Sequence, residues 1–156
     1  MRRRPLRAEA LGLELWGAPP PSSGGAAILF ASAFVGGYGQ PLAAAGVGLA
    51  AHRTVEAFKH AFALRMSMGD PAFWQNDALL ADMLDAQFVA ALRANTSDWT
   101  TQPPQNYGGS WNQLRSRPPE DHGTTHVSVV DQVRIMMLRA CFSRPDVFLI
   151  LRPAGK

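Results

Sequence analysis

The sequence predicts an α+β fold in which helix outweighs strand. Three stretches, residues 26–35, 54–68 and 77–94, carry apolar residues at spacings of three and four, which places them on one face of a helix. Strand-like patterns are shorter and lie towards the two ends of the chain. Of the 156 residues, 47% are hydrophobic and 17% are charged. This composition favours a packed core over disorder.

The beginning of the chain predicts a strand followed by a helix. Residues 11–16 alternate loosely and read as a strand that ends at Pro19-Pro20-Pro21, because consecutive prolines favour an extended path. The turn Ser22-Ser23-Gly24-Gly25 can cap the helix over 26–35, and its glycines allow another element or a ligand to approach closely. Its amides could also hold an anion, although a tight strand-to-helix turn is the simpler interpretation.

The middle of the chain predicts a longer helix. Residues 38–51 are rich in Gly and Ala and indicate a connection or a weak helix. The helix over 54–68 ends at Gly69-Asp70-Pro71, since Gly and Pro terminate helices. Its helical spacing predicts one apolar stripe, made of Val55, Phe58, Phe62 and Met66.

A third helix over 77–94 is followed by a long loop. Asn76 or Asp77 can cap this helix. Its predicted apolar face consists of Leu80, Met83, Leu84, Phe88 and Leu92. Residues 95–119 contain two Pro-Pro pairs and Gly108-Gly109, which indicates a loop without regular structure.

The end of the chain predicts little regular structure. Val127–Val130 is a short apolar run typical of a buried strand. Residues 132–139 have no hairpin signal and read as helix-like or unstructured. A further strand is possible over 147–151, before Arg152-Pro153.

Charge is unevenly distributed along the chain. Residues 1–7 hold four Arg and no acid, and residues 132–156 hold five basic residues and one acidic residue. Residues 8–131 hold six basic and eleven acidic residues, giving a net charge of −5. The basic ends are short and lack interleaved aromatics, so they do not indicate nucleic-acid binding. Because charge and pattern change there, we expect residues 1–8 and 132–156 to pack poorly against the rest.

Several site classes find no support in the sequence. The single cysteine, Cys141, excludes an intramolecular disulfide. His122 and His126 lack the Glu of a metalloprotease helix, so no metal or cofactor is expected. No stretch approaches the roughly 20 apolar residues of a membrane span. The basic Met1–Arg4 is not followed by the apolar run, about 7–15 residues long, of a signal peptide.

The stretch from Asp121 to Asp131 carries the chemical signal. Its Gly123-Thr124 pair directly precedes an apolar strand. An N-terminal-nucleophile hydrolase stores its nucleophile in this way: cleavage of the Gly-Thr bond frees a Thr whose hydroxyl attacks and whose α-amino group acts as the base. That amine titrates at a pKa of about 7.7–8.0, so it can accept a proton near neutrality. The alternative is a strand entry in which Thr is favoured by its β-propensity.

Four ordered blocks extend this signal across the chain. They are Pro19–Gly25, His52–Ala63, Gly69–Phe73 and Gly123–Asp131. In this order and at these spacings, the sequence from about Leu11 to Asp131 resembles the γ-glutamyltransferases, also called glutathione hydrolases. The resemblance identifies Thr124 as the catalytic nucleophile and Gly123-Thr124 as the autocleavage bond. Thr125 and His126 match the block, but no role follows for them.

The resemblance also implies a fold and a division of the chain. The family has an N-terminal-nucleophile hydrolase αββα sandwich, of which this chain would be a mostly helical fragment. Residues 1–10 would be a non-family basic N-terminus, and residues 11–123 the C-terminal part of the large subunit. Residues 124–131 would form the first strand of the small subunit, followed by a divergent tail over 132–156.

The implied activity is transfer of the γ-glutamyl group of glutathione to water or an acceptor amine, through an ester on Thr124. The implied partners are glutathione, other γ-glutamyl compounds and the remainder of both subunits, at the outer face of a membrane, secreted or in a vacuole. The family's substrate-holding and oxyanion residues have no matched positions here. We therefore expect a truncated chain that is inactive alone. The alternative is a non-catalytic remnant or interaction module that needs a partner to fold.

Overall fold

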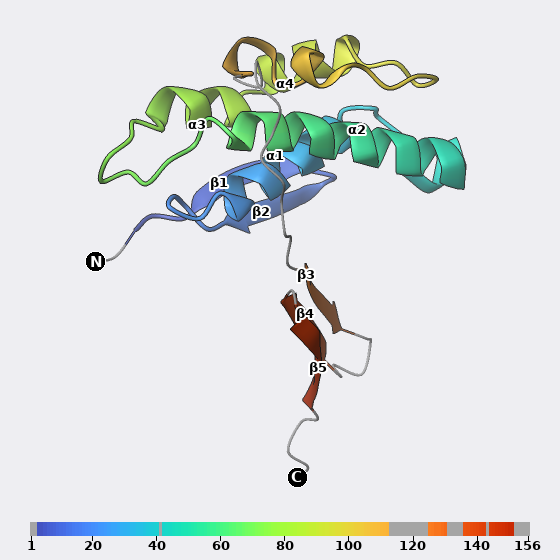
Figure 1. The fold of residues 1–156 in the computed structure, drawn as a ribbon. Coiled ribbons are helices and arrows are strands. Elements are labelled where there is room, and N and C mark those ends of the chain that lie inside the picture. The colour runs from blue at the N-terminus through green and yellow to red at the C-terminus, as the bar shows by residue number, and fades with distance from the viewer. Residues whose placement is uncertain (1–2, 41, 113–124, 131–135, 143, 152–156) are drawn as a thin grey trace. The chain divides into compact units, whose positions relative to one another are not determined.

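The computed structural model divides the chain into two compact units, Met1–Arg117 and Pro118–Lys156 (Figure 1). The structure describes residues 3–40, 42–112, 125–130, 136–142 and 144–151. The first unit contains the helices and a two-stranded hairpin, and the second contains a three-stranded sheet. None of the helices in these described ranges is long and apolar enough to cross a bilayer.

The first unit begins with a β-hairpin. Strands β1 (Leu6–Ala10) and β2 (Leu13–Gly17) pair antiparallel, with Ala10 opposite Leu13. The predicted strand over 11–16 is therefore partly wrong, because Leu11 and Gly12 form the turn, with φ angles of 56° and 73°. The expectation of poor packing is also wrong for β1, since Leu6 packs against the hydrophobic core. Pairing of β1 with β2 supplies the contacts that the charge pattern did not reveal.

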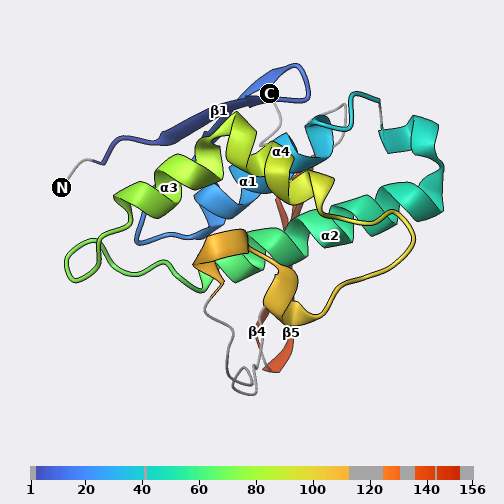
Figure 2. The same ribbon diagram turned by 90° about the horizontal axis from the view of Figure 1, so that it is seen from above.

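Helix α1 (Gly24–Gly36) lies at the centre of this unit, and Figure 2 shows it enclosed by the other elements. It confirms the helix predicted over 26–35 and contacts β1, β2, α2, α3 and α4. Its side chains Phe30 and Phe34 have no exposed surface. A Cβ added at Gly25 would collide with the backbone of Ala18, so this glycine serves close packing against the hairpin's end.

Helix α2 (Val47–Arg65) begins seven residues before its predicted start and follows a short 3₁₀ turn, Leu42–Ala45. The predicted apolar stripe is not the buried face. Its four side chains are about half exposed: Val55 48%, Phe58 50%, Phe62 55% and Met66 52%. The buried face instead carries Glu56, Ala57, His60, Ala61, Ala63 and Leu64. Small alanines on this face allow close approach to α1, and the polar residues find partners described below.

The helix predicted over 77–94 is two helices, α3 (Asp77–Leu84) and α4 (Ala86–Ala94). They are separated by Asp85, whose backbone is extended with ψ 124°. The carboxylate of Asp85 accepts a 2.7 Å hydrogen bond from the Phe88 amide and so caps α4. Met83 and Leu92 of the predicted apolar face are buried in the core, while Leu80 and Phe88 pack against its edge.

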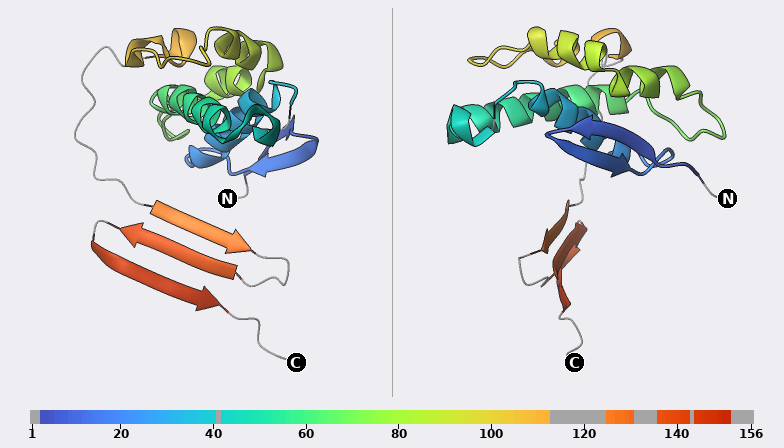
Figure 3. Two further views of the ribbon diagram at one scale, coloured as in Figure 1. Left: turned by 90° about the vertical axis from the view of Figure 1, so that its right-hand side faces the viewer. Right: turned by 180° about the vertical axis from the view of Figure 1, so that it is seen from behind.

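The second unit is an antiparallel sheet of strands β3 (Thr125–Val130), β4 (Met136–Phe142) and β5 (Arg144–Leu151), in that order (Figure 3). Thr125 lies opposite Cys141, and Val130 lies opposite Met136. The strands predicted over 127–130 and 147–151 are present and longer. The helix-like or unstructured interpretation of residues 132–139 is wrong for 136–139, because a short apolar run has no decisive period.

Candidate functional site

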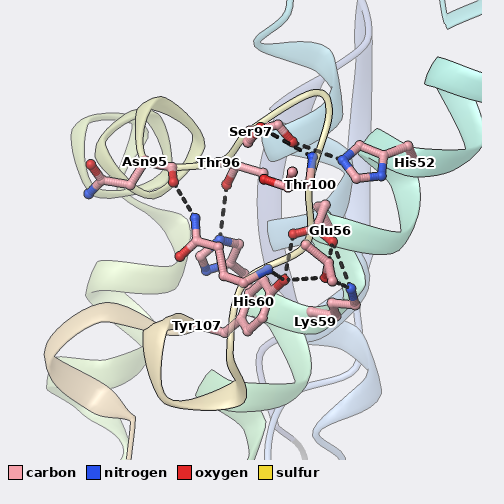
Figure 4. A network of polar contacts seen from close by, with 11 residues as sticks. His52, Glu56, Lys59, His60, Asn95, Thr96, Ser97, Thr100 and Tyr107 are labelled. Atoms are coloured by element: carbon pink, nitrogen blue, oxygen red, sulfur yellow. Dashed lines mark hydrogen bonds and ion pairs between the residues drawn. The ribbon is translucent and has the colours of Figure 1, made fainter.

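The residues singled out by the sequence, Gly123 and Thr124, lie outside the described residues. The structure does describe β3, which begins at Thr125, the next residue in the chain. It also describes the segment of residues 95–112, which precedes the Gly123-Thr124 pair in the sequence. Polar contacts between α2 and this 95–112 segment form the most extensive side-chain network among the described residues (Figure 4).

One face of α2 supplies the network. His52 and His60 each lie four residues from Glu56, and Lys59 lies three residues after it, so helical geometry brings Glu56 close to the other three. Figure 4 shows these side chains directed towards the chain that carries Thr96, Ser97 and Tyr107.

Glu56 is the centre of the network, and its side chain has no exposed surface. Its Oε2 accepts a 2.7 Å hydrogen bond from the Tyr107 hydroxyl, and its Oε1 accepts one of 2.7 Å from Lys59 Nζ. Thr101 Oγ1 donates a further bond of 3.0 Å to Oε1. Burial raises the pKa of Glu56, but the hydrogen bonds from Lys59, Tyr107 and Thr101 outweigh it, so the net pKa lies below its ordinary value. The carboxylate is therefore ionised at neutral pH.

Tyr107 links this carboxylate to its own segment. Its side chain is buried, and its hydroxyl oxygen accepts a 2.9 Å hydrogen bond from the Gln102 amide. Thr101 Oγ1 lies 2.9 Å from the same oxygen. The ammonium group of Lys59 lies 5.5 Å from the centre of the Tyr107 ring. The phenol thus closes the turn between residues 101 and 107 and fastens it to α2.

His60 makes the second buried connection. Its Nδ1 accepts a 3.1 Å hydrogen bond from the Gly108 amide, so in the neutral ring the proton is on Nε2. Nε2 lies 3.1 Å from Thr96 Oγ1, which in turn donates to the Leu92 carbonyl. Burial lowers the pKa of His60 to about 4, against the opposing effect of the Glu56 carboxylate. His60 is therefore neutral at physiological pH.

Further contacts fasten the start of the 95–112 segment. Arg53 forms a bidentate ion pair with Asp98, at 2.8 and 2.6 Å. Its guanidinium also lies 4.0 Å from the centre of the Tyr38 ring. The hydrogen bond from Arg53 lowers the pKa of Asp98. His52 Nε2 bonds the Ser97 carbonyl at 2.8 Å.

The end of the segment is fastened as well. Ser67 Oγ, just beyond α2, donates a 2.7 Å hydrogen bond to the Trp111 carbonyl. The Trp111 indole donates one of 2.7 Å to Asp82 of α3. Residues 95–119 were predicted to form a loop. In the described part of that range, the loop is interrupted by the short 3₁₀ turns Pro104–Asn106 and Gly109–Trp111. Hydrogen bonds with Ser67 and Asp82, rather than regular secondary structure, therefore hold the end of this segment.

This arrangement holds chain segments together. Two surface cavities of about 610 and 360 Å³ are lined by other residues, the larger by the β1–β2 turn, α1 and α4. Within the described ranges no three His, Cys, Asp or Glu side chains gather to hold a metal ion. The network connects structural elements, and its last contact, at Trp111, lies twelve positions before Gly123.

The sequence did not indicate roles for Glu56, His60 and Tyr107. A usable signal was present: Glu56 and His60 are four apart and each directly precedes an alanine, Ala57 and Ala61. Two polar residues on a face of small residues indicate a buried polar contact, but identifying that contact requires its partner. The partners lie 48 and 51 residues away, so the pattern alone could not supply them.

Comparison with known proteins identifies the family of this chain. A sequence model described as Gamma-glutamyltranspeptidase matches residues 1–137. The chain belongs to the gamma-glutamyltranspeptidase family. The match includes the first ten residues, which contain β1, and extends six residues beyond Asp131.

Curated members of the family are similar over most of this chain. Glutathione hydrolase 2 of Arabidopsis thaliana is 44% identical over 133 residues, which is 85% of this chain and 22% of that protein. A glutathione hydrolase proenzyme of Pseudomonas sp. is 37% identical over 132 residues, or 82% of this chain and 21% of its own length. The chain therefore spans about a fifth of the length of these relatives.

A solved structure shows the same fold. Helicobacter pylori gamma-glutamyltranspeptidase superposes with a TM-score of 0.61 over 74% of this chain and 33% of that chain, at 23% identity. This likeness confirms the predicted fold class, a mostly helical α+β portion of an N-terminal-nucleophile hydrolase.

Proposed function

We propose that this chain contains the maturation site of a glutathione hydrolase. In this proposal the Gly123-Thr124 bond is cleaved, and Thr124 becomes the nucleophile. Its hydroxyl attacks the γ-glutamyl carbonyl of glutathione while its α-amino group accepts the hydroxyl proton. The C–N bond breaks, and cysteinylglycine leaves with that proton as a free amine. Water or an acceptor amine then attacks the γ-glutamyl ester and releases the Thr124 hydroxyl.

The observation that carries the proposal is the family match over residues 1–137, which includes the whole Gly123–Asp131 block. The start of β3 at Thr125 supports it, because the nucleophile of this enzyme class stands at the start of a strand. The name of one relative, a glutathione hydrolase proenzyme, also fits a protein that is matured by cleavage.

We further propose that the 156 residues alone have no turnover, and that their partners are the remaining parts of the two subunits. The chain spans about a fifth of its relatives, so most of the surroundings of a family active site come from elsewhere. The half-exposed stripe Val55, Phe58, Phe62 and Met66 supports the second candidate, an interaction module that folds fully only with a partner.

A chimera tests the proposed nucleophile. Residues 11–131 replace the aligned part of the Arabidopsis relative, and both maturation and glutathione hydrolysis are measured. The parent chimera should mature and hydrolyse glutathione, and Thr124→Ala should abolish both. Thr125→Ala is the matched control, since it removes the neighbouring hydroxyl and should leave maturation in place. If Thr124→Ala matured and turned over like the parent chimera, Thr124 would not be the nucleophile.

Mass spectrometry of the unmodified chain tests its inactivity. Autocleavage needs an oxyanion stabiliser, and losing one such donor alone costs about 100- to 1000-fold in rate. We therefore expect the purified chain to remain intact at Gly123-Thr124 after long incubation. A fragment that begins at Thr124, and that is absent from the Thr124→Ala variant, would show that the chain retains the cleavage chemistry by itself.

A further inference from the structure

The buried contacts of α2 act on the stretch of chain that leads towards the proposed maturation site. The 95–112 segment has no strand and no α-helix, so backbone hydrogen bonds fix little of it. Its position depends on side chains of α2 and α3 and on Ser67, just beyond α2. Glu56 and His60 also bond Thr101 and Thr96, but their two buried bonds reach the adjacent residues Tyr107 and Gly108.

Geometry restricts what can stand at these two positions. Gly108 has a φ of 80°, and a Cβ there would lie 2.9 Å from the Ala63 Cβ on α2. The amide of Gly108 reaches His60 only because the backbone approaches the helix this closely. The Tyr107 hydroxyl meets a carboxylate whose other oxygen is already bonded to Lys59 and Thr101. Tyr107 and Gly108 can therefore bind α2 in only one position.

We propose that Glu56 and Tyr107 are positioning residues for the maturation of this protein. Their hydrogen bond holds the 95–112 segment, which precedes Gly123-Thr124 in the sequence, against α2. This inference rests on the function proposed above for Thr124, and it adds residues that the sequence motif does not contain. Neither residue acts on the reacting bond. They limit the freedom of the 95–112 segment, and in this proposal that constraint lowers the entropy that the cleavage geometry costs.

Native-state hydrogen exchange of the full 156-residue chain tests the holding role without any need for cleavage. Tyr107→Phe keeps the ring and removes the hydroxyl, and Glu56→Gln keeps the shape and removes the charge. In each variant, amides of residues 102–112 should exchange about tenfold faster than expected from the change in α1 amides. The double variant should add little, because both substitutions weaken or remove the same contact. Thr101→Val, which removes another donor to Glu56, serves if either variant fails to fold.

Asp85→Ala is the control for a general loss of stability. It removes the cap of α4 and touches neither Glu56 nor Tyr107, so exchange in α1 and in residues 102–112 should rise by the same factor. If Tyr107→Phe and Glu56→Gln behave like this control, or leave residues 102–112 as protected as in the parent, the proposal is overturned.

The chimera then tests the link to maturation. Tyr107→Phe should slow the appearance of the Thr124 amino terminus about tenfold, while the matured fraction keeps the parent KM for glutathione. An unchanged maturation rate overturns the positioning role. A parent chimera that never matures overturns the proposed function of Thr124 and, with it, the maturation role, whereas hydrogen exchange still decides whether the pair holds the segment.

Discussion

The hydroxyl of Tyr107 donates a 2.7 Å hydrogen bond to Oε2 of Glu56, a carboxylate with no exposed surface that lies 51 residues earlier in the chain. This one contact joins the middle of α2 to a segment that has little backbone structure of its own. A buried, ionised carboxylate is costly unless its oxygens are bonded. Here both oxygens accept hydrogen bonds, so the contact favours one position of the 95–112 segment.

Removing this carboxylate should destabilise the chain strongly. Glu56→Ala leaves the buried Tyr107 hydroxyl without its acceptor and leaves a cavity, and we expect a loss of about 3 kcal/mol in the free energy of unfolding. Glu56→Gln keeps an oxygen acceptor and should cost about 1 kcal/mol. Urea unfolding followed by circular dichroism measures both. The exposed ion-pair residue Glu14 supplies the control, since Glu14→Ala should cost below about 0.5 kcal/mol. Equal losses in the Glu56 and Glu14 variants would contradict the network.

Acid should weaken the first unit through His60. Its pKa is about 4 in the folded chain and 6.5 when unperturbed, so between these values the unfolded chain binds more protons. Stability is therefore fully present above pH 6.5 and falls as the pH drops towards 4, by about 3 kcal/mol in total. The free energy of unfolding, measured from pH 7.5 to 4.5, should show this slope. His60→Gln should flatten it, and Gln75→Ala, an exposed residue that does not titrate, should retain it.

Alanine substitutions at two glycines with positive φ distinguish the cost of backbone strain from the cost of a steric clash. Gly108 has a φ of 80° and an added Cβ would lie 2.9 Å from Ala63, whereas Gly39 has a φ of 69° and nothing within 4 Å. Gly39→Ala should therefore cost only the conformational strain, about 1 kcal/mol. Gly108→Ala should cost about 1–3 kcal/mol more, because the clash also moves its amide away from His60. Thermal and urea unfolding compare the two, and similar losses would show that the segment can shift without penalty.

The sequence predicted best the elements that are bounded by Pro or Gly and whose buried face is evident from their apolar residues. Pro19-Pro20-Pro21 and Gly36-Gly37 bracket α1, and its buried apolar run leaves no choice of face. The break at Asp85 was missed because apolar residues keep a helical spacing across it. The capping bond from the Phe88 amide to Asp85 decides in favour of two helices, and such a bond is visible only in three dimensions.

Periodicity shows which residues share a face, but it does not show which face is buried. In α2 the aromatic stripe was predicted to face the core. The face that is buried instead carries alanines, Leu64 and two polar residues. The candidate site divides in the same way. Gly123 and Thr124 followed from a local motif and a family resemblance, and their roles remain predictions. The Glu56–Tyr107 contact joins residues 51 positions apart, and no local pattern specifies such a pair.

The exposed stripe of α2 gives the last prediction. Phe58 and Phe62 are 50% and 55% exposed, so most of their apolar surface gains little from folding of this chain. The double variant Phe58→Gln/Phe62→Gln should change the free energy of unfolding by less than about 1 kcal/mol, whereas Phe30→Ala, at a fully buried position, should cost about 3–5 kcal/mol.

The same double variant should reduce self-association, because exposed apolar patches drive contact between molecules. Light scattering over a range of concentrations measures this, with Gln75→Ala as an exposed control that leaves association unchanged. In the chimera, where further chain surrounds these residues, the double variant should lower stability by more than it does in the isolated chain. A loss in the isolated chain as large as that of Phe30→Ala would show that the stripe is part of its core after all.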